Sequence, residues 1–297
     1  MVESRTFSAR LSRGIVYAIV ILMGLLCLLP ILNILALSLS SGTAIAGNRV
    51  GLIPVDLHFG AYQHMIEDEQ LWRSFGISTQ RTFLSLIINM FMITTMAYPL
   101  SKSKRQFRSR NIYMRFMVFA MLFSGGLIPT YLVVNRLGLV NTIWSLVLPG
   151  AVPIFSVILV MNFFANIPKS LEEAAVIDGA NPIQVLVRIY VPLSKAALAT
   201  VALFSIVWNW NDFFGGLVYM TRIENYPLMT YIQTLTFSIR DLLNAGISIA
   251  DIQHFVAVSD RNLNAAKIFL AAIPLLIIYP FLQKYFVTGI VVGAVKE

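Results

Sequence analysis

The segment Trp-Asn-Trp-Asn-Asp that ends at Asp212 places aromatic, amide and carboxylate side chains inside a long apolar stretch. Such polar groups are costly in apolar surroundings unless they face a cavity or a neighbouring helix. On a helix, Trp208, Asn211 and Asp212 share one face, with Asn209 and Phe213 on an adjacent face. Aromatic rings stack on the C–H faces of sugars, while amides and carboxylates bond to hydroxyls. We predict that these residues line a substrate pathway; the alternative is that they hold helices together.

The sequence offers little for enzyme catalysis. It contains no G-x-x-x-x-G-K-[ST] motif, so the chain cannot cradle ATP phosphates in a P-loop of its own. His58, His64 and His254 lie outside the apolar stretches at unrelated spacings, and Cys27 is the single cysteine. A histidine-dependent nucleophile and a cysteine metal cluster are therefore unsupported. We predict that the chain is not an enzyme and binds no metal or cofactor, and that a partner supplies any energy.

A polar segment beginning at Ser170 lies between two apolar stretches. Ser170 and Glu173 have the spacing of a capping box, which predicts the start of a short helix. Gly179 is suited to end that helix in the left-handed conformation. Asn181 and Pro182 predict the N-cap and first position of a second helix, since proline lacks the N–H that this position leaves unpaired. The segment is predicted to be a helix–turn–helix that meets a soluble partner; an ordinary amphipathic turn is the alternative.

Long apolar helices must position both groups of residues. With 58% hydrophobic and 12% charged residues, the chain cannot cover a globule with polar surface. Apolar runs of about 20 residues recur, and a helix of that length crosses a bilayer. We predict an all-α polytopic membrane protein with a single transmembrane domain over residues 1–297. Its six predicted spans cover residues 14–37, 81–100, 116–134, 142–165, 197–219 and 265–287.

The placement of lysine and arginine gives the orientation of the spans. Six spans put both termini on one side, together with residues 101–115 and 166–196, and most basic residues lie in these parts. The densest run consists of Lys102, Lys104, Arg105, Arg108, Arg110 and Arg115. Because basic residues gather on the cytoplasmic side, we predict that both termini and the helix–turn–helix are cytoplasmic. The net charge of +8 then indicates topology and contact with anionic lipids, and nucleic-acid binding is not predicted.

The spacing within the polar segment resembles a known motif. Glu173-Ala174-Ala175, Gly179, Ile189 and Pro192 follow the pattern E-A-A-x3-G-x9-I-x-L-P, with Val191 in place of the usual leucine. This pattern resembles the EAA loop of permease subunits in ABC importers. The resemblance implies that residues 168–195 form a coupling loop, which docks into a cleft on a cytosolic ATPase. The coupling residues that it implies are Glu172, Glu173, Ala174, Ala175, Asp178, Gly179, Ile189 and Pro192.

Further segments extend the resemblance over nearly the whole chain from about residue 80. Residues 124–131, 137–139 and 148–149 resemble the third and fourth spans of maltose-type carbohydrate permeases. Trp210-Asn211-Asp212-Phe213 resembles a signature of the second permease subunit of oligosaccharide importers. Within that group, the chain is most similar to the branch that handles oligosaccharides released from complex polysaccharides.

The resemblance implies a type I importer permease fold in the bacterial plasma membrane. The implied partners are a second permease subunit, two ATPase subunits that bind ATP and Mg, and an extracytoplasmic binding protein that delivers the oligosaccharide. In maltose-type relatives, the loop corresponding to residues 220–264 reaches into the binding protein.

Three alternatives stay open. The first is an ABC permease for another small solute, such as a peptide or polyamine. The second is a stand-alone secondary transporter, which would normally show internal repeats and several intramembrane ionisable groups. Asp212 is the only clear group of this kind in the predicted spans. The third is an intramembrane enzyme, and the predicted spans lack histidines and close carboxylate pairs for it.

Overall fold

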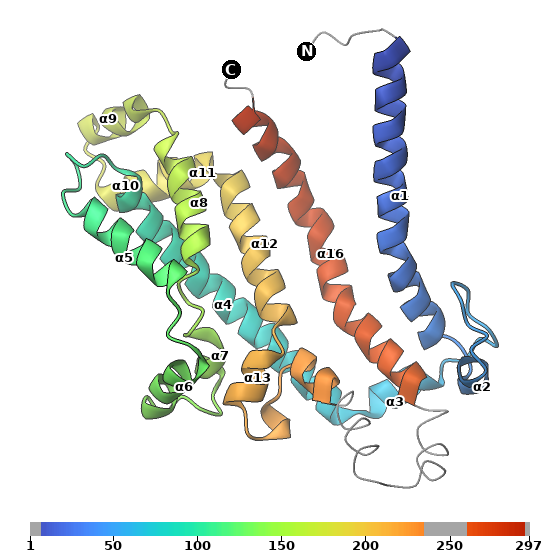
Figure 1. The fold of residues 1–297 in the computed structure, drawn as a ribbon. Coiled ribbons are helices and arrows are strands. Elements are labelled where there is room, and N and C mark those ends of the chain that lie inside the picture. Colours follow the sequence, from blue (N-terminus) through green and yellow to red (C-terminus); the bar gives the residue numbers. More distant parts are fainter. Residues whose placement is uncertain (1–6, 235–259, 295–297) are drawn as a thin grey trace. The chain divides into compact units, whose positions relative to one another are not determined.

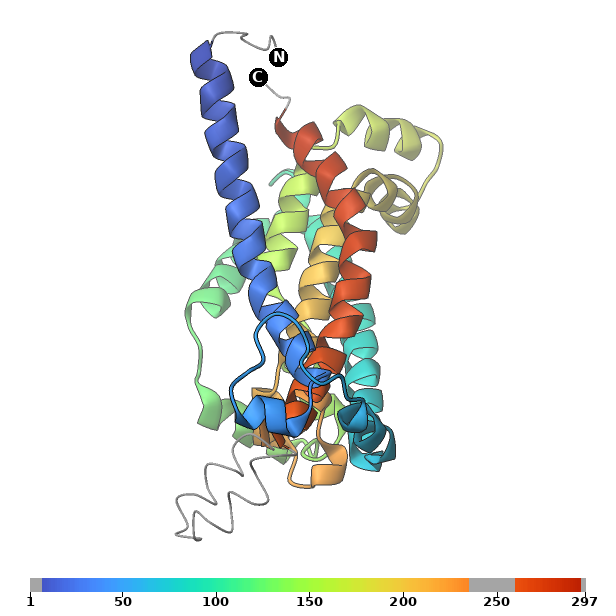
Figure 2. The same ribbon diagram turned by 90° about the vertical axis from the view of Figure 1, so that its right-hand side faces the viewer.

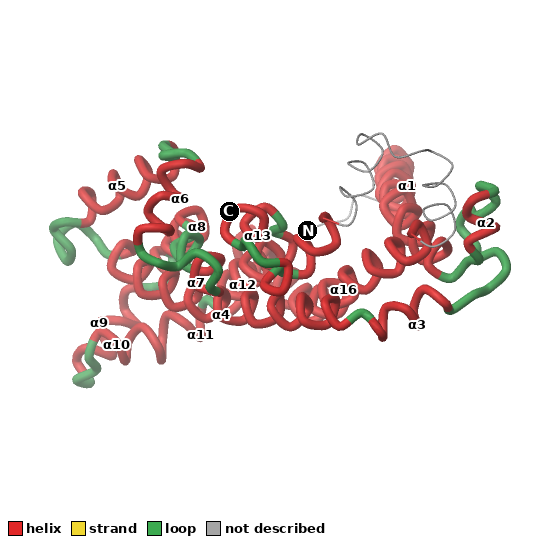
Figure 3. The backbone as a smooth tube through the Cα atoms, turned by 90° about the horizontal axis from the view of Figure 1, so that it is seen from below, coloured by secondary structure: helices red, strands yellow, loops and turns green. Residues whose placement is uncertain are grey.

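The structure is a computed structural model that describes residues 7–234 and 260–294 (Figure 1). These residues form helices joined by turns and loops, and no strand occurs among them (Figure 3). Their contacts divide the chain into two units. The first comprises residues 1–69 and 234–273, and the second comprises residues 70–233 and 274–297.

The first unit is tied together by buried polar contacts between segments far apart in the sequence. Its helices are α1 (Phe7–Ser38), α2 (Gly42–Ala46), α3 (Gly60–Glu67) and the first part of α16 (Asp260–Ala294). The Lys267 ammonium lies 2.6 Å from the Asp68 carboxylate, and both side chains are largely buried. The Asn262 amide donates to the Ser40 carbonyl. By contrast, the large apolar side chains of α1 from Leu11 to Leu32 are exposed, as expected of a helix that meets lipid or another subunit.

The second unit holds the remaining helices. In chain order they are α4 (Glu69–Ser101), α5 (Arg110–Leu122), α6 (Leu127–Arg136), α7 (Ile143–Val147), α8 (Ile154–Ala165), α9 (Lys169–Ile177), α10 (Pro182–Val185), the π-helical turn η1 (Leu186–Tyr190), α11 (Val191–Leu193), α12 (Lys195–Asn211), α13 (Phe214–Tyr219), the 3₁₀ turn η2 (Ile223–Asn225) and a helix over residues 228–234. Helices α9 and α10 lie at one end of this unit, and α6, α7 and α13 lie at the opposite end (Figures 1 and 2).

Within the described parts of the chain, three helices are long and apolar enough to cross a membrane: Leu11–Ser38, Glu69–Ser101 and Arg261–Phe281. Three more pairs of helices meet the criterion only if each bent pair counts as one span. The polytopic class agrees with the sequence, while the number of six spans stays a prediction.

Several predicted spans differ from the helices that contain them. Helix α4 begins at Glu69 rather than near residue 81. The segment 116–134 contains parts of two helices, α5 and α6, which meet at an angle of 112°. The bend falls beside Gly126, whose φ of 89° is outside the helical range and suits glycine. Residues 148–153, which include Pro149 and Pro153, separate α7 from α8.

The main core of the second unit forms where α4, α8 and α12 meet. Its most buried apolar side chains are Ile93 and Ala97 from α4, Val157 and Val160 from α8, and Val201 from α12. In a bilayer, helices associate mainly through van der Waals packing of such side chains and through hydrogen bonds between helices, because lipid is as apolar as the side chains themselves. These three helices therefore provide the rigid base on which the ends of the unit are built.

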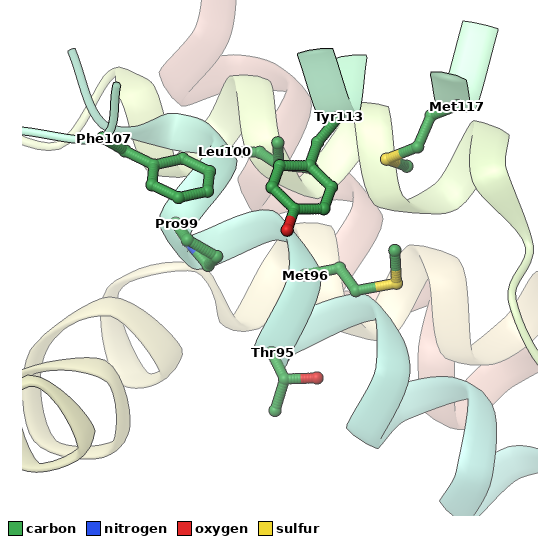
Figure 4. A pocket seen from close by; sticks show the side chains of 7 residues that line it. All are labelled: Thr95, Met96, Pro99, Leu100, Phe107, Tyr113 and Met117. Carbon is green, nitrogen blue, oxygen red and sulfur yellow. The ribbon is translucent and has the colours of Figure 1, made fainter. Parts of the chain in front are cut away.

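A cavity of about 200 Å³ lies where α5 crosses the last turns of α4 (Figure 4). Its lining is almost entirely apolar and consists of Thr95, Met96, Pro99, Leu100, Phe107, Tyr113 and Met117. This face of the end of α4 is consequently less tightly packed than the core.

Candidate functional site

The helix–turn–helix (residues 169–193) is built largely by local sequence signals. Gly179 has a φ of 82°, so it occupies the left-handed region as the sequence predicts. Asn181 caps α10: its side chain accepts from the Gln184 N–H, and the Gln184 side chain accepts from the Asn181 N–H, each at 2.9 Å. Pro182 occupies the first turn, as expected. The second helix then continues through the π-helical turn η1, which the sequence did not indicate.

The predicted capping box at the start of α9 is wrong. Helix α9 begins at Lys169 with Pro168 at the N-cap, and no side chain caps it. Ser170 therefore lies inside the first turn of the helix. A side chain acts as an N-cap only from a residue with non-helical backbone geometry, so Ser170 and Glu173 cannot form the reciprocal pair.

The helix–turn–helix exposes apolar side chains to an unusual degree. No residue of α9 is buried, and all of its residues are described. Ile177 is 86% exposed, and Val176, Ile183 and Val187 are also exposed. Contiguous apolar surface of this kind marks an interaction site rather than a solvated face. The helix–turn–helix also contains a groove of about 400 Å³, which is lined by residues of α9, of the turn and of the second helix.

The structure brings some of the predicted coupling residues together and separates others. Ala175, Asp178, Gly179 and Ile189 line the groove. Ala174, Glu173 and Pro192 are exposed outside it. Glu172 points away from this surface, toward the rest of the unit. The coupling roles of these residues stay predictions.

Glu172 belongs to a compact group of four residues, Tyr98, Lys102, Glu172 and Tyr190, which we call the Glu172 cluster. Its carboxylate accepts from the Lys102 ammonium and from the Tyr190 hydroxyl, each at 2.7 Å. The Lys102 ammonium also donates to the Tyr190 hydroxyl at 2.9 Å. It lies 4.0 Å from the centre of the Tyr98 ring and 4.2 Å from that of Tyr190. The Tyr98 and Tyr190 rings pack edge to face, with 5.0 Å between their centroids.

Electrostatics keep the Glu172 carboxylate charged. Burial alone would raise the pKa of Glu172, but the hydrogen bonds from Lys102 and Tyr190, with the charge of Lys102, lower it below its ordinary value of 4.5. Burial, followed by the nearby carboxylate, raises the pKa of the Tyr190 hydroxyl, which therefore stays a hydrogen-bond donor. Burial also lowers the pKa of Lys102, and Glu172 opposes this change only in part.

The predicted substrate-pathway residues lie only in part where the helical projection placed them. Helix α12 ends at Asn211, so Asp212 lies beyond it as the C-cap residue with extended backbone. Trp208 and Asn211 are exposed, whereas Asn209 is buried. The exposure of Trp208 and Asn211 and the burial of Asn209 agree with the two predicted faces, whereas the projection is wrong for Asp212 and Phe213, because the helix does not continue through them.

Asp212 forms a buried ion pair with Arg81 of α4. The Arg81 guanidinium donates to the Asp212 carboxylate at 2.5 Å and to the Asp212 carbonyl at 3.0 Å. The carboxylate also accepts from the Gly215 N–H at 3.1 Å, which fixes the chain between α12 and α13. The Arg81 side chain is only 3% exposed. Asp212 therefore stabilises the helix break, and its role in a substrate pathway stays a prediction.

Arg81 is the important residue that the sequence reasoning missed. The predicted span began at residue 81, so the arginine was placed at a membrane surface. A stripe of small and polar residues on α4 would have indicated a buried polar face, since its members recur every three or four positions. The stripe comprises Ser74, Ser78, Arg81, Thr82, Ser85 and Asn89, all buried.

A second cavity, the Trp208 pocket, lies beside the core between α4, α12 and the break before α8. Its volume is about 330 Å³. It is lined by Asn89, Gly150, Val152, Pro153, Phe155, Ser156, Phe204, Ser205, Trp208 and Asn209, and this described lining contains no charged side chain. Of the predicted pathway residues, Trp208 and Asn209 line the pocket; Asn211, Asp212 and Phe213 do not.

The polar wall of the Trp208 pocket is organised by Asn89. Its amide lies 2.9 Å from the Ser205 hydroxyl. With the amide turned over, its nitrogen donates to the carbonyls of Gly150 and Ala151 at 3.2 and 3.1 Å. Asn89 thus ties α12 to backbone groups that the break before α8 leaves without helical partners. An aromatic ring, amides, hydroxyls and loop carbonyls around a neutral cavity suit a ligand with both C–H faces and hydroxyl groups.

Comparisons with known proteins place this geometry in context. The profile of the family described as "Binding-protein-dependent transport system inner membrane component" matches residues 75–292. Protein LplC of Bacillus subtilis is 39% identical over 273 residues, which cover 92% of this chain and 90% of that protein. The polygalacturonan/rhamnogalacturonan transport system permease protein YtcP of the same organism is 34% identical, covering 97% and 99%.

A solved structure is similar throughout the chain. It is a bacterial ABC transporter involved in the import of the acidic polysaccharide alginate. One of its chains superposes with a TM-score of 0.80 at 34% sequence identity, covering 95% of this chain and 98% of that one.

The Arg81–Asp212 pair gives a prediction about stability. Asp212→Asn should lower the free energy of unfolding by about 3–5 kcal/mol, because Arg81 keeps a buried charge without its counter-charge. Thermal unfolding of the purified protein in detergent measures this as a lower Tm. Arg81→Met combined with Asp212→Asn should recover much of the loss. Asp56→Asn is the control, since Asp56 pairs with Arg49 on the exposed surface; equal Tm changes for Asp56→Asn and Asp212→Asn would contradict the prediction.

The Glu172 cluster predicts a pH dependence. Since the folded-state pKa of Glu172 is below 4.5, its ionic contacts stabilise the protein fully above that pH and are lost as the pH falls through the lowered pKa. The Tm difference between the wild type and Glu172→Gln should therefore be largest near neutral pH and shrink in acid. For Glu173→Gln, at an exposed position, the difference should be small at every pH. A Glu172→Gln difference that grew in acid would refute the assignment.

Proposed function

The chain belongs to the family of binding-protein-dependent transport system inner membrane components, and we propose that it forms, with a second permease subunit, the translocation pathway for an oligosaccharide. It is a membrane-embedded permease subunit of an ABC transporter, as the family match over residues 75–292 requires. The finer assignments of cargo, partners and orientation are our proposal.

The cargo that the chain suits best is an oligosaccharide derived from a complex polysaccharide. One relative is named as a permease of a polygalacturonan/rhamnogalacturonan transport system, and the similar solved structure is a transporter involved in the import of alginate. The Trp208 pocket supports the same substrate class, because a ring that is 74% exposed stands beside amides and hydroxyls. A polyamine would require carboxylates to bind its ammonium groups, and none occurs in the described lining.

The observation that carries the proposed mechanism is the exposed apolar surface of the helix–turn–helix. A cleft on a cytosolic ATPase would cover Val176, Ile177 and Ile183, and Glu173 stands at an exposed position where an ATPase arginine could pair with it. Two ATPase subunits would bind and hydrolyse ATP with Mg, so this chain itself would be non-catalytic. Closure of the ATPase pair would then move the helix–turn–helix and drive the spans between inward-facing and outward-facing states.

The remaining parts of the assembly follow from this orientation. The helix–turn–helix and both termini would face the cytoplasm of a bacterial cell, and a binding protein would deliver the cargo from outside. The predicted role of the connection 220–264 in contacting that protein falls mostly on residues 235–259, which lie outside the described residues.

The turn at Gly179 tests the docking role. Gly179→Val or Gly179→Pro should uncouple ATP hydrolysis from uptake, because the left-handed φ of 82° strains both residues. Uptake of labelled oligosaccharide and phosphate release are measured on the complete complex in lipid vesicles. Gly179→Asn should retain much of the coupling, since asparagine tolerates this conformation. Wild-type transport by the valine and proline variants would argue against docking through this element.

The Trp208 pocket gives a separate test of the cargo. Trp208→Ala should raise the oligosaccharide concentration needed for half-maximal uptake several-fold, whereas Trp208→Phe should retain a stacking surface. Phe213→Ala is the matched control, since Phe213 is an exposed aromatic residue outside the pocket. Equal effects of Trp208→Ala and Phe213→Ala would show that the pocket does not select the sugar.

A further inference from the structure

Two adjacent glutamates of α9 have opposite environments. Glu173 is exposed on the surface of the helix–turn–helix. The Glu172 side chain is only 15% exposed and turns toward α4. No residue of this fully described helix is buried, and the small Ala175 is its one residue that packs against the main core, so apolar packing contributes little to holding it in place. An ionised side chain directed inward from such a helix therefore needs a specific explanation.

The contacts of Glu172 join three segments that are separate in the sequence. One carboxylate oxygen accepts from Lys102, just beyond the end of α4, and the other accepts from Tyr190, at the end of η1. Tyr190 is itself buried and packs edge to face on Phe164 of α8 at 5.3 Å. Charge-assisted hydrogen bonds with two different donors fix both the position and the rotation of the carboxylate.

Lys102 is held from several sides rather than by a single contact. The carboxylate, the Tyr190 hydroxyl and the faces of two aromatic rings all surround its ammonium group. Such interactions are stronger in partly buried surroundings than in water. A lysine with one exposed partner forms a weak connection, whereas these contacts together hold α9 against the end of α4.

Helix α4 leads from this cluster to the Trp208 pocket. Asn89, which organises the polar wall of the pocket, lies 13 positions before Lys102, or about 20 Å along a helix. Arg81 on the same helix anchors the break after α12. Near the cluster, the last turns of α4 also border the apolar cavity of Figure 4. Close packing therefore does not oppose a displacement of the helix end on that side.

We propose that Glu172 is a positioning residue that transmits movement of the helix–turn–helix to α4 through Lys102 and Tyr190. The inference rests on the proposed function, in which an ATPase moves this element. It assigns different tasks to the two glutamates: Glu173 faces the partner, and Glu172 connects the element to the helix that reaches the pocket. Tyr190 is the second holder of the carboxylate, and Tyr98 completes the aromatic surroundings of the ammonium.

The test uses the complete transporter in lipid vesicles and compares Glu172→Gln, Tyr190→Phe and Glu173→Gln. Three quantities are measured: the ATPase that copurifies, the rate of ATP hydrolysis and the uptake of labelled oligosaccharide. We expect Glu172→Gln and Tyr190→Phe to assemble normally and hydrolyse ATP, yet to use several-fold more ATP for each sugar transported. Glu173→Gln should instead weaken copurification of the ATPase.

A charge exchange separates transmission from a merely structural role. Lys102→Glu should uncouple the complex, and Lys102→Glu combined with Glu172→Lys should restore part of the coupling. If Glu172→Gln, Tyr190→Phe and Lys102→Glu lower hydrolysis and uptake in proportion, or prevent assembly, Glu172 is structural and the inference is overturned. Normal coupling in Glu172→Gln, with uncoupling in Gly179→Val, would overturn this inference alone. Normal coupling in both would also remove the proposed docking.

Discussion

A charge removed from water must find its opposite within hydrogen-bond reach, and this constraint determines how the helix ends of this chain are held. Among the described residues, Lys267 with Asp68 ties α16 to the first unit, Arg81 with Asp212 fixes the break after α12, and Lys102 with Glu172 fixes α9. Each pair joins segments far apart in the sequence. Apolar packing is non-directional, so it does not by itself determine which residues of these segments meet. In the second unit, the apolar core holds the helices together, and the pairs Arg81–Asp212 and Lys102–Glu172 fix which segments meet.

The positions of the helix breaks depend on a similar requirement, that buried polar groups have hydrogen-bond partners. A helix end leaves carbonyls and N–H groups without partners, and lipid offers none. The breaks before α8 and after α12 therefore occur where side chains can satisfy these groups: Asn89 reaches Gly150 and Ala151, and Asp212 receives the Gly215 N–H. Asn89 also lines the Trp208 pocket, whereas Asp212 does not. The two breaks thus occur where polar side chains replace the hydrogen bonds that a continuous helix would have made.

Local signals were readable from the sequence, and distant pairings were not. Gly179 and Asn181 have the predicted conformations because each acts on its own backbone within a few residues. Composition gave the membrane class, and the spacing of the polar segment gave the family. The ion pair between Arg81 and Asp212 spans 131 positions, and no local pattern identifies such a partner. Ser170 and Asp212 were misplaced for a related reason: each projection assumed a helix boundary that differs from the observed one, since α9 begins at Lys169 and α12 ends at Asn211.

The π-helical turn η1 has a consequence for the length of the chain. Glu172 and Tyr190 must meet across an interval of 18 positions that also contains the turn at Gly179. Adding or removing one residue within the second helix would rotate the tyrosine by about 100°, carrying its hydroxyl away from the carboxylate. Side chains on the outer surface can be exchanged without this penalty, as long as their number is kept. The segment is therefore expected to tolerate substitutions on its outer surface far more readily than insertions or deletions.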